Sequence, residues 1–215
     1  MRLSGANVTI ERGGRRLFSD LTFEVAAGEA LIVTGPNGAG KSSLLRAIAG
    51  LNPAAAGAIA LEGGDDEQTV GEQSHYVGHA DALKGALTAR ENLDFWAQML
   101  RGAAEASARA RQARALRVVA ALDRLGLAHV VDFPVNVLSA GQKRRVALAR
   151  VLVAYRPLWL LDEPTSALDA AARMRLAEIM RAHLAGGGLI VAATHAPLGL
   201  DARQLNLGAK ELVYP

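Results

Sequence analysis

A stretch of nine residues, GPNGAGKSS, has the composition and spacing of a phosphate-binding loop. Its glycines would let backbone N–H groups turn inward around phosphate oxygens. Lys41 would add a charge for the β and γ phosphates, and the Ser42 hydroxyl would bind Mg²⁺. The loop follows the apolar run ALIVT and opens a helical pattern, the context this chemistry requires. We therefore predict a nucleotide site made by Gly35, Pro36, Asn37, Gly38, Ala39, Gly40, Lys41, Ser42 and Ser43.

Two further apolar runs end in residues that could complete the reaction. LWLLDE ends in Asp162, which would orient the metal, and in Glu163, which is poised to take a proton from the attacking water. LIVAATH ends in His195, which is placed to contact the γ-phosphate and to position that water. Taken alone, the two carboxylates could simply be solvated, and the histidine could have only a structural role. Together with Lys41 they form the predicted catalytic set.

A second helix start has the features of an anion site. In LSAGQKRRVALAR, Ser139 can cap the helix and, with Gly141 and the free N–H groups behind it, offers such a site at the positive end of the helix dipole. One nucleotide cannot use both cradles if they lie on separate subdomains that face the same way. The economical arrangement is a two-fold pair, in which the helix start of one copy closes over the nucleotide held by the other. Hydrolysis would then require a dimer.

The elements that position these residues predict an α/β fold with a mostly parallel sheet. The apolar runs from Ala30, Leu158 and Leu189 are typical of buried parallel strands, and helical patterns at 41–49 and 170–184 follow two of them. The first 64 residues predict antiparallel strands attached to that sheet. We expect one domain over 1–215, with an ATPase core and an antiparallel β subdomain at 1–82 and 156–215, and an inserted α-helical subdomain at 83–155.

Composition narrows the class of protein. The 215 residues are 51% hydrophobic and 21% charged, which suits a globular domain with a substantial core. The absence of cysteine excludes disulfides and thiolate metal sites. The net charge is only +3 and the basic residues are dispersed, so we expect no nucleic-acid partner. The arginine-rich segment 103–126 is interpreted as a solvated helix face, with an acidic partner as the alternative. The apolar runs are too short to span a bilayer, so if the chain works at a membrane, something else must hold it there.

Five ordered motifs resemble the nucleotide-binding subunits of ATP-binding cassette (ABC) transporters, which have a P-loop NTPase core. They are GPNGAGKSS, LSAGQ, LWLLDE, SALD and the histidine at 195. The resemblance implies that the cofactors are ATP and Mg²⁺ and that the partner is a second copy of the chain. It also implies that Ser139 and Gly141 contact ATP across the dimer interface, where Asp169 lies as well.

Three positions depart from the common pattern of that family. His79 stands where most members have glutamine, at a switch that senses Mg²⁺ and faces the membrane partner. Arg12 takes the place of the aromatic that stacks on adenine, and its guanidinium plane could stack instead. Ala140 replaces the second glycine of the signature motif, LSAGQ. None of these changes removes a catalytic group.

These departures, with YVGH, LTARENL and THAPL, are similar to the ATP-binding subunits of the haem exporter of bacterial cytochrome c maturation. That resemblance implies a peripheral subunit on the cytoplasmic face of the inner membrane, joined to separate integral membrane permease subunits of the maturation system. Its role would be ATP-driven export of haem or release of a haem-loaded chaperone. Because His79 and His195 have positions in the ATP machinery, we interpret His75, His129 and His183 as surface residues and expect no direct haem binding by this chain.

Three alternatives stay open. The chain could serve another small ABC exporter, or it could be a mechanical ABC ATPase that acts on DNA or ribosomes without a membrane. Mechanical members usually carry two cassettes in one chain or long insertions, and this compact chain has neither. It could also be a module that binds ATP as a structural ligand, but an intact set of Lys41, Asp162, Glu163 and His195 argues against that.

Overall fold

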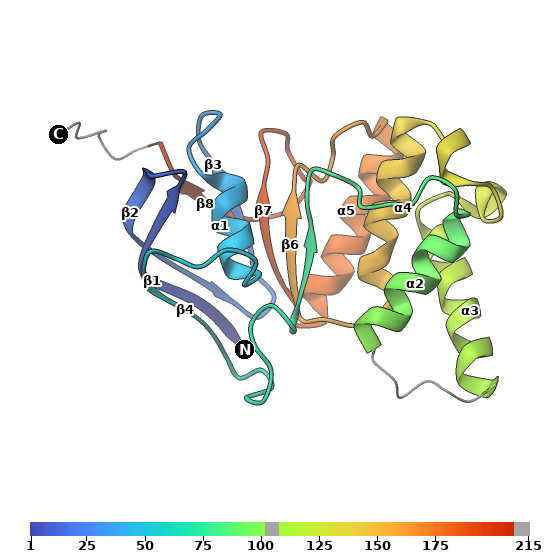
Figure 1. The fold of residues 1–215 in the computed structure, drawn as a ribbon, viewed down its shortest axis with the longest axis horizontal. Helices are drawn as coiled ribbons and strands as arrows, with labels where there is room; N and C mark the ends of the chain where they lie inside the picture. Colours follow the sequence, from blue (N-terminus) through green and yellow to red (C-terminus); the bar gives the residue numbers. More distant parts are fainter. Residues whose placement is uncertain (102–107, 209–215) are drawn as a thin grey trace. The chain divides into compact units, whose positions relative to one another are not determined.

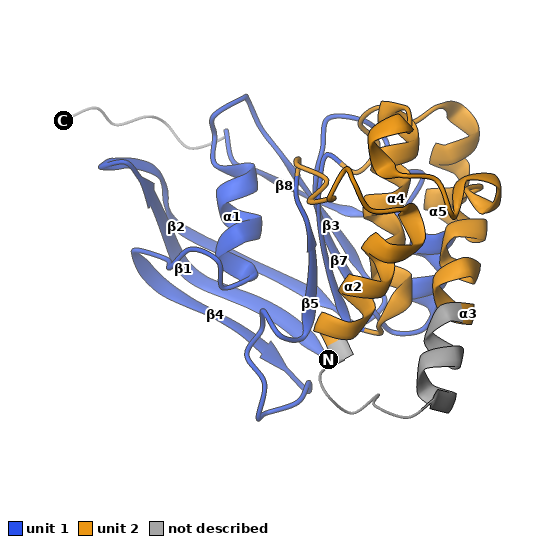
Figure 2. Ribbon diagram, turned by 45° about the vertical axis from the view of Figure 1, so that its right-hand side comes forward, with its two compact units in different colours: residues 1–78, 156–163, 179–215 blue, residues 79–155, 164–178 orange. Residues whose placement is uncertain are grey.

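The computed structural model describes residues 1–101 and 108–208, and the chain forms two compact units (Figure 2). Unit 1 comprises 1–78, 156–163 and 179–215, and unit 2 comprises 79–155 and 164–178. The sequence pattern places the internal boundaries at 82/83 and 155/156, whereas the units separate at 78/79 and assign 164–178 to the helical part. The arginine-rich segment 103–126 lies partly outside the described residues.

Unit 1 contains the predicted parallel sheet. It has five strands in the order β5 (Ser74–Val77), β6 (Leu158–Asp162), β7 (Leu189–Ala193), β3 (Ala30–Thr34) and β8 (Arg203–Asn206). All four neighbouring pairs are parallel, and every residue of β6 and β7 is buried. Strands covered on both faces carry continuous apolar runs, which is why these strands could be located from the sequence.

The first 64 residues contain the predicted antiparallel strands, but these form a separate sheet and do not extend the parallel one as expected, because within the described residues β1 pairs with β2 and β4 only. Its order is β2 (Arg15–Ala26), β1 (Arg2–Arg12) and β4 (Ala56–Glu62). The β1–β2 hairpin turns at Gly13 and Gly14, whose φ angles of 58° and 76° match a turn that needs positive φ at both central positions.

Helix α1 (Lys41–Ile48) packs between the two sheets of unit 1 (Figure 1). Leu44, Leu45 and Ile48 lie on its buried side and are almost entirely shielded from water. They join one apolar cluster with residues from both sheets, among them Leu3, Val25, Val33, Leu160 and Val191. The helix that begins at the phosphate loop is therefore anchored in a hydrophobic core that both sheets of unit 1 share.

Unit 2 is helical, as predicted, and is built on α2 (Ala89–Arg101), α3 (Ala108–Arg124) and α4 (Ala140–Val153). Two short 3₁₀ helices, at Ala128–Val130 and Val135–Val137, lead into α4. The Arg150 guanidinium lies 4.7 Å from the centre of the Trp96 ring, which joins α4 to α2. The boundary between the units falls within α5 (Ala170–Ala185), after residue 178. No helix of the described residues is both long and apolar enough to span a membrane.

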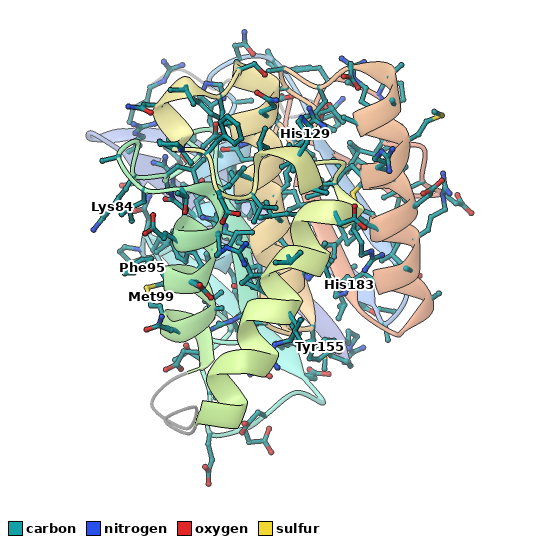
Figure 3. The ribbon with its side chains drawn as sticks, turned by 90° about the vertical axis from the view of Figure 1, so that its right-hand side faces the viewer. Lys84, Phe95, Met99, His129, Tyr155 and His183 are labelled. Atoms are coloured by element: carbon teal, nitrogen blue, oxygen red, sulfur yellow. The ribbon has the colours of Figure 1, made fainter. Side chains whose placement is uncertain are left out.

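The prediction that three histidines lie on the surface is confirmed for His129 and wrong for the other two (His129 and His183 are labelled in Figure 3). His75 is 2% exposed, because it lies in β5 beside Trp159 of β6. His183 is half-buried and stacks on the Trp159 ring, with the ring centres 3.8 Å apart. Burial lowers the pKa of His183, while the backbone carbonyl of Pro157 partly opposes that effect. The His183 ring thus packs against Trp159.

Candidate ATP site

The phosphate loop occupies the turn between β3 and α1, with the backbone conformation that its glycines permit. Gly35, Gly38 and Gly40 have φ angles of 137°, 86° and 100°, which L side chains rarely adopt. The Lys41 ammonium donates hydrogen bonds to the carbonyl oxygens of Gly35 at 2.7 Å and Pro36 at 3.0 Å. The charge is therefore held against the loop itself, at the start of a helix whose first N–H groups are available to an anion.

Two segments that the sequence did not indicate support this loop within unit 1. A Cβ atom on Gly40 would lie 2.9 Å from the Phe18 ring of β2. A Cβ atom on Gly35 would lie 3.3 Å from the backbone nitrogen of Gly208, beyond β8. Close packing is thus a second reason for glycine at position 40, and it leaves little space for a side chain at position 35. No local pattern could have revealed either contact, because both join segments far apart in the chain.

The register of the parallel strands gathers the predicted catalytic residues at one edge of the sheet. Ala193 of β7 pairs with Asp162 of β6 on one side and with Val33 of β3 on the other. The carboxyl ends of three neighbouring strands therefore lie together, and each continues into a predicted motif. Beyond these ends come the phosphate loop, Glu163 and the exposed His195. Ligands of open α/β sheets bind beyond such strand ends.

The two consecutive carboxylates have different environments. Asp162 is 4% exposed at the end of β6. Glu163 is half-buried and has a φ of 48°, an uncommon conformation for a residue with a side chain. Its N–H donates to the carbonyl of Ala193 at 2.8 Å, and the Thr194 hydroxyl donates to its Oε2 at 3.3 Å. The neighbouring strand thus fixes both the backbone and the carboxylate of Glu163, and Thr194 is a contributor that the sequence did not single out.

A basic residue on α1 lies near the proposed metal ligands. Arg46 stands one helical turn after Ser42, on the same face of the helix. Its Nε donates to the Tyr76 hydroxyl at 3.2 Å. The pKa of Arg46 is raised, chiefly by this hydrogen bond and the charge interaction with Tyr76, and to a lesser extent by the charge of Asp162. Arg46 thus adds positive potential on the Asp162 side of unit 1.

The donor set suits Mg²⁺ that arrives with a nucleotide. Among the described residues, no group of three or more histidine and carboxylate side chains could hold a metal alone. Mg²⁺ is commonly held by one or two protein oxygens, substrate phosphates and water. The Ser42 hydroxyl and the Asp162 carboxylate are oxygen donors of that kind, on two elements of unit 1. The residues therefore fit a metal that is shared with phosphate oxygens.

In unit 2, the start of α4 has the predicted cap and a partner that the sequence reasoning missed. The backbone N–H of Gln142 donates to the Ser139 hydroxyl at 3.2 Å, and the N–H of Ser139 donates to the Gln142 Oε1 at 2.9 Å. The pattern of serine followed by glutamine three residues later was the available signal for this capping box. A Cβ atom on Gly141 would lie 2.7 Å from the carbonyl oxygen of Ala167, so this position needs glycine.

The remaining predicted residues are exposed and have simpler surroundings. Asp169 caps α5, because its Oδ1 accepts the N–H of Ala172 at 2.7 Å. Arg12 ends β1 opposite Arg15 in the hairpin. His79 follows β5 by two residues and belongs to unit 2.

A P-loop between β3 and α1, adjacent carboxylates at the end of β6 in the same sheet, and a glycine-bearing capped helix in a helical unit define an ATPase of the cassette class. The family model described as "ABC transporter" matches residues 18–166, which is more than half of the chain. The chain belongs to the ABC transporter family and is an ATP-binding subunit of that family.

Two relatives that match nearly the whole length of this chain have the same name. The chain is 53% identical over 208 residues to the "Cytochrome c biogenesis ATP-binding export protein CcmA" of Nitrobacter winogradskyi, covering 97% of this chain and 98% of that protein. It is 55% identical over 208 residues to the protein of the same name from Rhodopseudomonas palustris strain BisB18, with the same coverage.

Solved structures agree in fold. An ATP-binding subunit of an ABC transporter matches with a TM-score of 0.78 and 29% identity, covering 91% of this chain and 80% of that chain. An ATP-binding cassette solved as a dimer in a post-hydrolysis state, bound to ADP and Pi, matches with a TM-score of 0.76 and 26% identity, covering 90% and 88%. The family and fold expected from the sequence are confirmed.

Proposed function

We propose that this chain hydrolyses MgATP in the composite sites of a two-fold dimer and thereby drives export of haem, or release of a haem-loaded chaperone, during cytochrome c biogenesis. The observation that carries the cargo assignment is the similarity, over 97% of the chain, to export proteins named for cytochrome c biogenesis. The ATPase assignment has separate support from the strand ends that gather Lys41, Asp162, Glu163 and His195.

The catalytic roles follow from these positions. The phosphate loop, residues 35–43, binds the triphosphate through backbone N–H groups and Lys41. Ser42 and Asp162 would hold Mg²⁺, which would supply positive charge toward the phosphate oxygens. Glu163 accepts a proton from the attacking water, with its carboxylate oriented by the Thr194 hydroxyl. His195 contacts the γ-phosphate and positions the water.

The second anion site completes the chemistry in a dimer. Ser139 already accepts one backbone hydrogen bond, and its hydroxyl hydrogen can still be donated to a phosphate oxygen. Ser139 and Gly141 of one copy then bind the nucleotide of the other, with Asp169 at the interface between the two sites. ATP can drive a cycle only by binding the closed dimer more tightly than the open one.

The chain is one domain that works at a membrane with other proteins. Residues 1–215 act as one nucleotide-binding domain, a peripheral subunit on the cytoplasmic face of the inner membrane. The segment that begins at His79 faces integral membrane permease subunits and senses Mg²⁺, and Arg12 stacks on adenine. No nucleic acid takes part, and haem is not held by this chain.

The test uses a tagged Glu163→Gln variant purified from native membranes with MgATP, followed by mass spectrometry of the associated proteins. Lys41→Ala, which loses the triphosphate contact, is the matched control. Recovery of cytochrome c maturation membrane subunits with Glu163→Gln, reduced with Lys41→Ala, supports the proposal. Recovery of an unrelated permease favours another small exporter, and recovery of ribosomes or DNA-bound proteins favours a mechanical ATPase.

A further inference from the structure

In unit 2, the segment that follows His79 is hydrogen-bonded to the segment that precedes α4. Residues 85–90 lie beside residues 131–136, and four backbone hydrogen bonds join them. They run from Asn136 N to Gly85 O at 2.9 Å, Val135 N to Leu87 O at 2.9 Å, Ala89 N to Phe133 O at 3.1 Å and Arg90 N to Val131 O at 2.9 Å. The proposed switch segment and the residues leading into the signature motif are therefore parts of one hydrogen-bonded structure.

One buried side chain closes the loop between His79 and α2. Asn92 is 3% exposed, and its amide nitrogen donates to the carbonyls of Lys84, Leu87 and Thr88 while its oxygen accepts the N–H of Lys84. The Lys84 ammonium also lies 5.5 Å from the centre of the Phe95 ring, and the two side chains are neighbours in Figure 3. The loop thus has a defined shape that can transmit a displacement.

An ion pair joins the first residues of this loop directly to α4. Asp81, two residues after His79, accepts a hydrogen bond from the Arg144 guanidinium at 3.1 Å. The Arg144 side chain is 4% exposed and that of Asp81 is 29% exposed. Arg144 lies three residues after Gly141, within the first turns of the helix that Ser139 caps. The Asp81 carboxylate supplies a compensating charge to this buried guanidinium, so the ion pair ties Asp81 to α4.

We propose that Asp81 and Arg144 are a positioning pair that holds the segment beginning at His79 against the signature helix, so that displacement of this segment moves Ser139 and Gly141 with it. The inference deepens the proposed function and rests on it. Neither residue touches ATP. The pair acts by keeping the permease-facing segment and the anion site of α4 in a constant relation.

The geometry allows a direct test with an engineered crosslink. A Cβ atom on Gly85 would lie 3.5 Å from the Cβ of Asn136, within the range that a disulfide spans. The chain has no cysteine, so a Gly85→Cys/Asn136→Cys variant contains a single possible disulfide. Oxidation then ties the two segments together without the ion pair, and reduction releases them.

The experiment compares ATPase rates of four proteins, the native chain and Asp81→Asn, each with and without the cysteine pair. We expect Asp81→Asn to lower kcat about tenfold while its affinity for a fluorescent ATP analogue changes less than about twofold, because the pair acts on closure and not on the phosphate loop. Oxidation should restore most of the rate to Asp81→Asn and leave the otherwise native cysteine variant active. Inhibition of that variant by oxidation, or no recovery in Asp81→Asn, would overturn the proposal.

A second measurement does not depend on ATPase activity. Hydrogen exchange at the amides of Ala89, Val135 and Asn136 should be about tenfold faster in Asp81→Asn than in the native chain. Asp132→Asn is the matched control, because Asp132 pairs with Arg90 across the same two segments but is 73% exposed. Exchange in Asp81→Asn that is no faster than in Asp132→Asn refutes the pairing role. If the native chain shows no ATPase, the proposed function fails and this measurement still decides the role of the pair.

Discussion

Ser139→Asp should separate the structural role of Ser139 from its proposed role toward ATP. Both side chains can accept the N–H of Gln142 and cap α4, and a carboxylate is favourable near a helix N-terminus. The folded state should therefore keep its stability. The same carboxylate would repel the phosphates of the nucleotide that the partner copy holds, so ATP-dependent dimerisation should be lost.

The magnitudes distinguish the two roles. Ser139→Ala removes the cap and should cost about 1 kcal/mol, which lowers Tm by about 2–4 °C for a chain of this size. Loss of a hydrogen bond to a charged group costs about 1.5–3 kcal/mol, or about 10–150-fold in affinity at each site. Ser139→Asp adds repulsion to this loss and should weaken dimerisation further, while its Tm stays near the native value.

The assay pairs thermal unfolding without nucleotide, so that ATP-dependent dimers do not contribute to Tm, with analytical ultracentrifugation in MgATP, for each variant in the Glu163→Gln background. The expected order of Tm is native and Ser139→Asp together, with Ser139→Ala lower. A Ser139→Asp protein that forms MgATP dimers as tightly as the parent would refute the placement of Ser139 at a phosphate. A large fall in its Tm would refute the capping argument instead.

Three further outcomes are expected. Gly141→Ala should lower the free energy of unfolding in urea by about 1–3 kcal/mol, because the new Cβ atom meets the Ala167 carbonyl oxygen. The control is Ala140→Gly at the exposed neighbouring position, which should cost less than about 1 kcal/mol. Equal costs would contradict the contact with Ala167. Burial lowers the pKa of His183 below its usual 6.5, so the folded state favours the neutral ring; the resulting stability is fully present above pH 6.5 and is lost as the pH falls from 6.5 through the lowered pKa. His183→Phe keeps the stacking on Trp159 and should flatten the pH dependence of the free energy of unfolding in urea over this range. An unchanged pH dependence would exclude His183 as the titrating group. Haem titrated into the isolated chain should show no stoichiometric binding, and an axial-histidine absorption spectrum would contradict that prediction.

Local patterns were sufficient to place most residues of the proposed ATP site on their strands and helices. Lys41, Asp162 and His195 each follow an apolar run, and a parallel sheet brings the carboxyl ends of such runs to one edge. The signature helix could also be located, because serine and glycine at a helix start report a cap directly. The spacing of Ser139 and Gln142 also indicates the capping box, although the sequence analysis predicted a capping role for Ser139 alone.

Contacts between distant segments could not be predicted in the same way. His75 is buried beside Trp159 in the sheet and His183 is half-buried against the Trp159 ring, and nothing in the neighbouring residues of either histidine indicates that ring. The Asp81–Arg144 pair joins residues 63 positions apart. Thr194 precedes a predicted residue, but its bond to Glu163 depends on the pairing of β6 with β7. Such contacts follow from strand order and helix packing, which no single local pattern specifies.

The most direct test of the account is the mass of the Glu163→Gln protein in solution. With MgATP it should sediment at twice the 22.5 kDa of the chain, and with ADP as a single chain, while its turnover is at least about a hundredfold below the native rate. A mass that is the same with both nucleotides would contradict the shared sites. A native rate of hydrolysis would contradict Glu163 as the base.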